Sequence, residues 1–303
     1  MDCRKFSTSD IRSLIVLTDY SGYMHFMHCN THSSIQTVYA KSEAGYVGRD
    51  LPSADQQLNI NSLVWGLAEE IGSPAYWAAQ AWMWEVEAPA HYKLGRSLEE
   101  ELIACLLGGY GIPAEVGLAA YERLRVANTE DPNRLLNEES VLELLADPLE
   151  LNGKFVRYRF AKQKSAYLAG SMRALRSLDR EAPDRELRDA LTTLPGVGPK
   201  TASWIVRNWR DSDCVSILDI HILRAGRMLQ IFPEGKSVER HYHELEEAFL
   251  DFAEAISVKA SILDSVMWMN MRQIPAAILR RLADPSAEAF SPKAEPVQLS
   301  LAL

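Results

Sequence analysis

The 303-residue chain is long enough for one large hydrophobic core or two smaller ones, and 47% hydrophobic with 24% charged residues is typical of a globular protein. Residues 1–10 contain no apolar signal region, and no run approaches the roughly 18 apolar residues that a membrane span needs, so we expect a soluble protein of the cytoplasm. The net charge of −9 argues against a passive coat on nucleic acid.

Four cysteines, at positions 3, 29, 105 and 214, are scattered through the chain. None forms a C-x-x-C pair, so the sequence predicts neither a zinc site nor a disulfide framework. We therefore expect a protein that uses no metal ion and no cofactor.

The N-terminal part of the chain has the pattern of β-structure. Residues 11–29 alternate between apolar and polar side chains around Ser21-Gly22, which predicts a β-hairpin, and residues 34–40 are expected to add a strand. We expect residues 1–57 to form a small β-rich region.

Beyond Pro52 the apolar residues recur at spacings of three and four, which predicts a mainly α protein. Ser97 is the expected N-cap of one helix, with Glu100 reaching back in a capping box. The segment from Pro285 is rich in small and polar residues and is typical of a flexible tail, so the helical domain is expected at 58–284 and the tail at 285–303. The predicted helices cover 59–71, 74–86, 99–111, 113–126, 138–147, 155–177, 184–193, 199–209, 220–230, 237–257 and 259–271.

The most informative stretch is 194–224. Gly196-Val197-Gly198 predicts a tight turn that opens a helix with Lys200 in its first turn, and exposed N–H groups at such a turn can hold a phosphate. Asp219 follows nineteen residues later in an apolar run. A neutral lysine can attack an electrophilic carbon, and a half-buried carboxylate can stabilise a cationic sugar or move a proton. Together these features indicate an enzyme that excises bases from DNA.

The stretch L-P-G-V-G-P-K, followed by D-I-H-I-L, resembles the helix-hairpin-helix (HhH-GPD) DNA glycosylase superfamily. Within it the chain is most similar to 8-oxoguanine DNA glycosylases with AP lyase activity, closest to their archaeal-type branch, over roughly residues 95–275. The resemblance implies the HhH-GPD helical fold, Lys200 as the nucleophile and Asp219 as the catalytic carboxylate.

Each role has a physical requirement. A lysine has a reference pKa of about 10.4, so Lys200 must first lose a proton, and burial together with the positive end of its helix favours the neutral form. Asp219 can equally be the N-cap of the helix at 220–230, and both roles can hold together.

Further residues are expected to hold the DNA backbone. The resemblance places His221 near a phosphate, although a core histidine is the alternative. Arg157 and Arg159 belong to a basic segment interleaved with aromatic residues, which is either a DNA-binding face or a solvated helix face. The other basic residues of this segment are Lys154, Lys162 and Lys164, and the aromatic residues are Phe155, Tyr158 and Phe160.

The resemblance also implies a base pocket. Asp264 would accept a hydrogen bond from the flipped purine and Trp268 would stack on it, with Trp204 as the opposite wall; an amphipathic core helix is the alternative for the first two. The loop at 108–112 lies where the superfamily places its wedge, so Tyr110 or Ile112 would fill the hole left by the base, unless the loop is a plain turn.

The resulting hypothesis is a monomeric, nucleoid-associated glycosylase and AP lyase that removes an oxidised purine, first of all 8-oxoguanine, from double-stranded DNA. The alternatives are an anti-phage glycosylase that acts on modified bases of invading DNA and a non-catalytic module that binds DNA or a partner.

The last residues resemble the Q-L-x-L-x-L peptide with which bacterial DNA enzymes bind the sliding clamp, unless these leucines fold back on the protein itself. The residues that would bind the clamp are Gln298, Leu299, Leu301 and Leu303.

Overall fold

A computed structural model describes residues 35–60, 62–87, 95–109 and 111–275, together with the strand backbone at 15–18 and 24–28. These residues contain ten α-helices, two short 3-10 helices and two antiparallel sheets, which confirms a mainly α fold with an N-terminal β region. The α-helices are α1 (Pro74–Glu87), α2 (Leu98–Leu107), α3 (Ala114–Glu130), α4 (Glu138–Ala146), α5 (Ala161–Ala174), α6 (Asp184–Leu191), α7 (Pro199–Arg210), α8 (Ile220–Met228), α9 (Val238–Ala255) and α10 (Ala260–Gln273), and the 3-10 helices are η1 (Arg134–Leu136) and η2 (Leu175–Ser177).

The N-terminal sheet has four strands in the order β1-β2-β3-β4. The predicted hairpin is confirmed, since β1 (Ile15–Thr18) pairs antiparallel with β2 (Met24–His28), and the third predicted strand is β3 (Gln36–Ser42). The sequence analysis missed β4 (Gly45–Leu51). Most of its side chains are exposed, so it lacks the alternating apolar residues that reveal a half-buried strand.

Two helix predictions were wrong. The described residues of 59–71 form turns rather than a helix, and Val64 forms a β-bridge with Gln57. The apolar spacing of this segment instead reflects the burial of Trp65 and Ala68. The helix expected at 155–177 begins only at Ala161.

The residues before α5 form a second, two-stranded sheet of β5 (Leu149–Leu151) and β6 (Lys154–Val156). Asn152 and Gly153 have φ values of 51° and 73° at the turn between the strands. An Asn-Gly pair with positive φ is the usual two-residue hairpin turn, and the sequence analysis overlooked this signal.

The start of α2 is close to the expectation. The hydroxyl of Ser97 accepts a hydrogen bond from the N–H of Glu100 at 3.2 Å, as an N-cap does. The Glu100 carboxylate accepts from the N–H of Arg96 at 2.7 Å rather than from that of Ser97, so the reciprocal half of the capping box shifts by one residue.

The helices enclose two hydrophobic cores. The terminal lobe, which combines both ends of the described chain, buries β3, β4, α1, α8, α9 and α10 around Trp77 and Phe249. The central lobe buries α2 to α7 around Leu102 and Leu168. Because β3 packs against α1 in one core, the sheet is part of the terminal lobe; the expected domain boundary after residue 57 stays a prediction.

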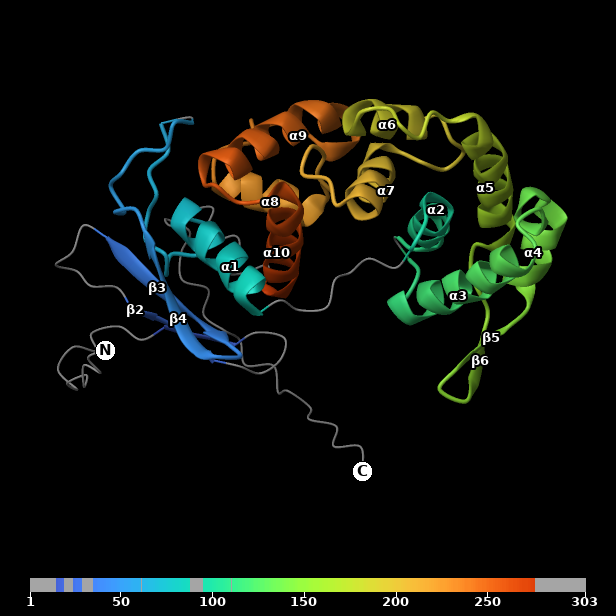
Figure 1. The fold of residues 1–303 in the computed structure, drawn as a ribbon, viewed down its shortest axis with the longest axis horizontal. Helices are drawn as coiled ribbons and strands as arrows, with labels where there is room; N and C mark the ends of the chain where they lie inside the picture. The colour runs from blue at the N-terminus through green and yellow to red at the C-terminus, as the bar shows by residue number, and fades with distance from the viewer. Residues whose placement is uncertain are drawn as a thin grey trace, which may run out of the picture.

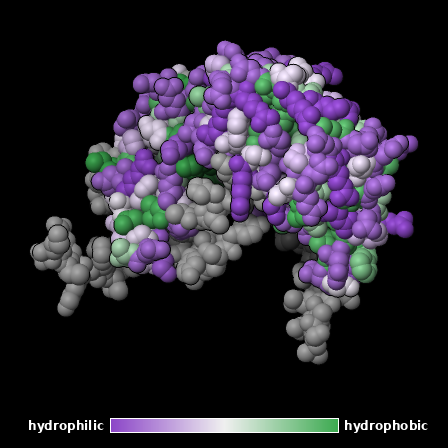
Figure 2. Space-filling model, turned by 45° about the vertical axis from the view of Figure 1, so that its right-hand side comes forward, coloured by the Kyte–Doolittle hydropathy of each residue, from purple (hydrophilic) through white to green (hydrophobic). Residues whose placement is uncertain are grey.

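The elements form an arch (Figure 1). The sheet, α1 and α10 lie in one limb, α2 to α5 lie in the other, and α6 and α9 lie at the crown above α7. The space-filling view shows a mostly hydrophilic face and a concave outline between the limbs (Figure 2).

The chain passes from the central to the terminal lobe through residues 211–219, which we call the crossing segment. Val215 belongs to the central core and Leu218 to the terminal core.

Candidate active site

The predicted glycine turn leads directly into α7. The N–H of Val197 donates to the carbonyl oxygen of Leu194 at 3.1 Å, and Gly196 has a φ of 77°. With Pro195 before it, Gly196 has the second central position of a type II turn, where φ must be positive. Gly198 is the N-cap of α7, so the N–H groups of the first helical turn lack acceptors within the helix. The turn therefore presents the positive end of α7 to an anion.

This turn is fixed against α5. A Cβ atom at Gly196 would lie 2.4 Å from the ring of Tyr167, so only glycine fits there. The hydroxyl of Ser171 donates to the carbonyl oxygen of Pro195 at 2.9 Å. Two residues of α5 therefore hold the glycine turn before any ligand binds.

The structure brings Lys200 and Asp219 together from different lobes. The Nζ atom of Lys200 lies 3.8 Å from Oδ2 of Asp219. Asp219 is also the N-cap of α8, because its Oδ1 accepts from the N–H groups of His221 at 2.7 Å and Ile222 at 3.2 Å. The two oxygens thus have separate tasks, so the capping interpretation and an interaction with the lysine hold at once.

The described protein residues do not bury Lys200 by themselves. Its side chain is 45% exposed, whereas that of Asp219 is 14% exposed. The lysine lies in the first turn of α7, which is exposed to solvent beside the glycine turn. Exclusion of water from its amine would therefore require a bound ligand, while the helix terminus and the carboxylate are already in place.

His221 follows the aspartate at the start of α8 and is half-buried. Its Nδ1 atom is buried and has no hydrogen-bond partner within the part of the chain that the structure describes. The residue is therefore neither a fully satisfied core histidine nor a freely solvated one, and its contact with a phosphate stays a prediction.

The basic segment lies partly on β6 and partly on α5. Arg157 and Arg159 are exposed, as is Phe155 at 76%, whereas Tyr158 is buried and donates its hydroxyl to the carbonyl oxygen of Leu107 at 2.8 Å. Burial lowers the pKa of Lys164 on α5. The segment is thus no uniform solvated helix face, because a hairpin, a connecting stretch and a helix each contribute to it.

The loop expected to carry the wedge lies beside this segment. A Cβ atom at Gly111 would lie 3.7 Å from Nη1 of Arg159 and 3.8 Å from the ring of Phe160. Ile112 is half-buried and packs against the central core, which favours a structural role for it. Tyr110 lies outside the described residues.

The three residues expected in a base pocket differ in their surroundings. Trp204 is half-buried against the central core, and Trp268 is 38% exposed with the guanidinium of Arg272 4.5 Å from its ring centre. Asp264 is only 2% exposed, and protein donors already occupy both of its oxygens. The structure therefore favours the core-helix alternative for Asp264 rather than an acceptor that is open to a base.

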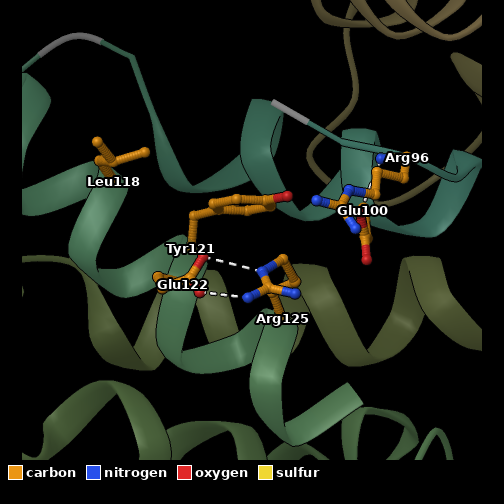
Figure 3. Close-up of a pocket in the computed structure, with 6 residues that line it drawn as sticks. All are labelled: Arg96, Glu100, Leu118, Tyr121, Glu122 and Arg125. Atoms are coloured by element: carbon orange, nitrogen blue, oxygen red, sulfur yellow. Dashed lines mark hydrogen bonds and ion pairs between the residues drawn. The ribbon is translucent and has the colours of Figure 1, made fainter. Parts of the chain in front are cut away.

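Two pockets on the described surface are lined by residues other than Lys200 and Asp219. One pocket of about 260 Å³ lies between the start of α2 and α3, where Glu122 pairs with Arg125 (Figure 3). Its lining residues are Arg96, Glu100, Leu118, Tyr121, Glu122 and Arg125. The proposed site is instead an open surface at the N-terminus of α7.

In the described ranges no cluster of three or more metal-ligating side chains occurs, and no helix combines the length and hydrophobicity of a membrane span.

A family model matches the central part of the chain. Residues 97–258 match the family Ogg-HhH, described as 8-oxoguanine DNA glycosylase. The chain is 30% identical over 139 residues to an 8-oxoguanine DNA glycosylase/AP lyase of Methanocaldococcus jannaschii, a match that covers 43% of this chain and 65% of the relative. A protein of the same description from Fusobacterium nucleatum is 27% identical over 150 residues, covering 43% of this chain and 69% of that protein. The chain thus spans just under two thirds of the first relative.

Solved structures are also similar. The crystal structure of the M. jannaschii 8-oxoguanine DNA glycosylase matches 58% of this chain and 78% of that chain, with 26% identity and a TM-score of 0.43. A non-covalent Endonuclease III–DNA complex matches 68% of this chain and 91% of that chain, with 20% identity and a TM-score of 0.50. The second likeness concerns the fold alone.

Proposed function

Because the chain belongs to the Ogg-HhH family of 8-oxoguanine DNA glycosylases, which it matches over more than half of its length, we propose that it is a bifunctional DNA glycosylase and AP lyase. The proposed substrate is duplex DNA that contains an oxidised purine, first of all 8-oxoguanine. The observation that carries the proposal is the 3.8 Å approach of the Lys200 amine to the Asp219 carboxylate beside the glycine turn.

The chemistry follows from this pair. The neutral amine of Lys200 attacks C1′ of the flipped nucleotide, and the electrons of the glycosidic bond leave with the base. Asp219 stabilises the positive charge that develops on the sugar. Loss of one amine proton and opening of the sugar ring, in which O4′ takes up a proton, give a protonated Schiff base; removal of a proton from C2′ then expels the 3′ phosphate.

Further residues would hold the DNA. The turn at 196–198 and α7 supply N–H groups for one phosphate, and Arg157, Arg159 and His221 supply positive or donor groups along the backbone. Trp204 and Trp268 are the proposed walls of the base pocket, and Tyr110 is the proposed wedge. The net charge of −9 makes such a local basic surface necessary.

The test is a panel of duplexes, each with one 8-oxoguanine, another oxidised base, a phage-type modified base or no lesion. We expect cleavage at 8-oxoguanine before alkali, since a lyase needs no alkali to break the strand. Cleavage only at phage-type bases would favour an anti-phage enzyme. DNA binding without any base release would favour a non-catalytic module and overturn the proposal.

We also propose that the tail binds a bacterial sliding clamp and keeps the monomeric enzyme at replicating nucleoid DNA through a raised effective concentration. Gln298 would enter a polar pocket, and Leu299, Leu301 and Leu303 an apolar one. These residues lie outside the described structure. Purified clamp should bind the full chain and not a chain truncated after Ala294; equal binding to both, or to neither, would contradict the proposal.

A further inference from the structure

The crossing segment is held through its backbone immediately before Asp219. Three successive N–H groups each donate to a different side chain from α9 or α10, and all three acceptors are buried. The contacts are Ser216 to Oε1 of Glu246 (2.9 Å), Ile217 to Oδ2 of Asp264 (3.0 Å) and Leu218 to the hydroxyl of Tyr242 (3.2 Å).

Tyr242 holds this segment in two ways. Besides accepting from Leu218, its hydroxyl donates to the carbonyl oxygen of Ser216 at 2.6 Å. Burial raises the pKa of Tyr242, so the hydroxyl keeps the proton that this second bond needs. A single buried oxygen thereby fixes both ends of a three-residue stretch.

Both carboxylates also reach into the central lobe. Glu246 accepts from the hydroxyl of Ser203 on α7 at 3.1 Å and pairs with Arg188 on α6. Asp264 accepts from Nη2 of Arg207 on α7 at 2.6 Å. Each carboxylate therefore connects the helices of the central lobe, including the one that carries Lys200, with the segment that carries Asp219.

Stability alone is a weak reason for this arrangement. Glu246 and Asp264 are 1% and 2% exposed, and burial raises the pKa of Asp264, against the opposing effects of Arg207 and the N–H of Ile217. Well-packed apolar side chains are often as stabilising as buried ion pairs. Buried hydrogen bonds of this kind do, however, fix geometry, because a displacement of the segment would break them and leave the buried donors and acceptors unpaired.

We infer that Glu246, Tyr242 and Asp264 are positioning residues that set Asp219 against Lys200 across the two lobes. The inference rests on the proposed function and adds to it: neither carboxylate is assigned to the DNA, and both act through the crossing segment. When the hydrogen bonds that support a reacting group are lost and the group moves by a fraction of an ångström, the reaction becomes slower.

Tyr242→Phe is the cleanest test, because it removes one hydroxyl and keeps the ring in the core. We expect single-turnover base excision to slow by about tenfold, with binding of the same duplex unchanged. Tyr76→Phe is the matched control, since Tyr76 is also buried in the terminal core and its hydroxyl contacts Asn270 instead. Equal rates for the two variants would overturn the inference.

A double-mutant cycle separates positioning from general loss of stability. If Tyr242 acts through Asp219, Tyr242→Phe should cost little or nothing in an Asp219→Asn background. An equal cost in both backgrounds would mean that the hydroxyl acts elsewhere and would overturn the inference.

Hydrogen exchange tests the same inference without activity. The amides of residues 216–218 should be strongly protected in the wild-type chain, and Tyr242→Phe should raise their exchange while leaving the amides of α1 unchanged. Unchanged exchange at 216–218 would overturn the inference even if the chain proved to have another substrate. A wild-type chain that is protected at these amides but inactive on every lesion would instead overturn the proposed function.

Discussion

At the scale of single residues, Asp219 shows how one carboxylate can have two tasks. Oδ1 accepts two N–H groups at the start of α8, while Oδ2 faces the Lys200 amine at 3.8 Å. The cap fixes the side chain, so in the proposed reaction the second oxygen needs no further ordering to stabilise a positively charged sugar. Substitution of Lys200 and of Asp219 by amide side chains is therefore expected to affect activity in different ways.

Lys200→Gln should abolish borohydride trapping of the protein on DNA with an 8-oxoguanine or an abasic site, because the amide cannot form a Schiff base. Binding of the same DNA should persist, since the glycine turn is untouched. Lys236→Gln is the control, because that lysine pairs with Glu244 at 2.9 Å away from the site. Trapping by the Lys200 variant would identify another nucleophile.

Asp219→Asn should slow single-turnover base excision by roughly 100-fold or more, the effect of one positioned electrostatic group. The amide oxygen can still cap α8, so the thermal midpoint should change little. Asp131→Asn makes the same change at a carboxylate that accepts from the N–H of Asn133 at 2.9 Å in a remote turn. If both variants excise at the wild-type rate, Asp219 only caps the helix.

At the scale of elements, the turn, α5 and α7 work as one unit. Tyr167 of α5 packs against the turn where a Cβ atom cannot fit, and the turn places the first N–H groups of α7 at the surface. The same helix carries Lys200 and, one turn later, Trp204. A phosphate held at the turn would therefore fix the nucleotide relative to the lysine.

Gly196→Ala should weaken DNA binding about tenfold, equivalent to about 1.4 kcal/mol, because the new methyl group displaces Tyr167 and the turn. Gly235→Ala is matched in backbone strain, since both glycines have a φ of 77°, but no atom lies within 4 Å of a Cβ atom at Gly235. Titration of a lesion duplex with both variants compares them. A similar loss of affinity in each would show that strain alone is responsible.

At the scale of the molecule, two apolar cores meet through a polar seam. This polar seam consists of the buried pairs Arg188–Glu246 and Arg207–Asp264 together with the crossing segment, and it connects the central and terminal lobes. Since Lys200 and Asp219 belong to different lobes, this seam controls the distance between them. Each lobe contributes one limb of the arch in Figure 1, and the two lobes meet at its crown, where α6 and α9 lie.

Arg188→Met should lower the free energy of unfolding by about 3 kcal/mol or more, because it leaves Glu246 as a buried charge without its cation. Arg185→Met on the same helix removes the Arg185–Glu247 pair, whose side chains are 47% and 53% exposed, together with a 3.2 Å hydrogen bond to the carbonyl oxygen of Cys214, and should cost about 1 kcal/mol or less. Urea unfolding of both variants measures the difference. Equal losses would show that the seam contributes no more than a surface pair.

The sequence by itself determined the local features of this protein. Helix periodicity located most of the α-helices, the alternation around Ser21-Gly22 predicted the first hairpin, and Gly196, Lys200 and Asp219 indicated the family. These features depend on neighbours within a few residues, so they can be found without knowledge of the fold. The exposed strand β4 was missed because a solvent-facing strand leaves no such pattern.

Only the tertiary structure decided which side chains meet. Asp264 has the spacing of a base-pocket residue, yet it is enclosed by Arg207, Ser265 and Ile217. Glu246 lies on an amphipathic helix, where a charged residue is normally expected to face solvent, and its burial follows from Arg188 lying 58 residues earlier in the chain. Long-range pairing of this kind depends on how helices cross, which no local sequence pattern contains, and it is this pairing that brings Lys200 and Asp219 together.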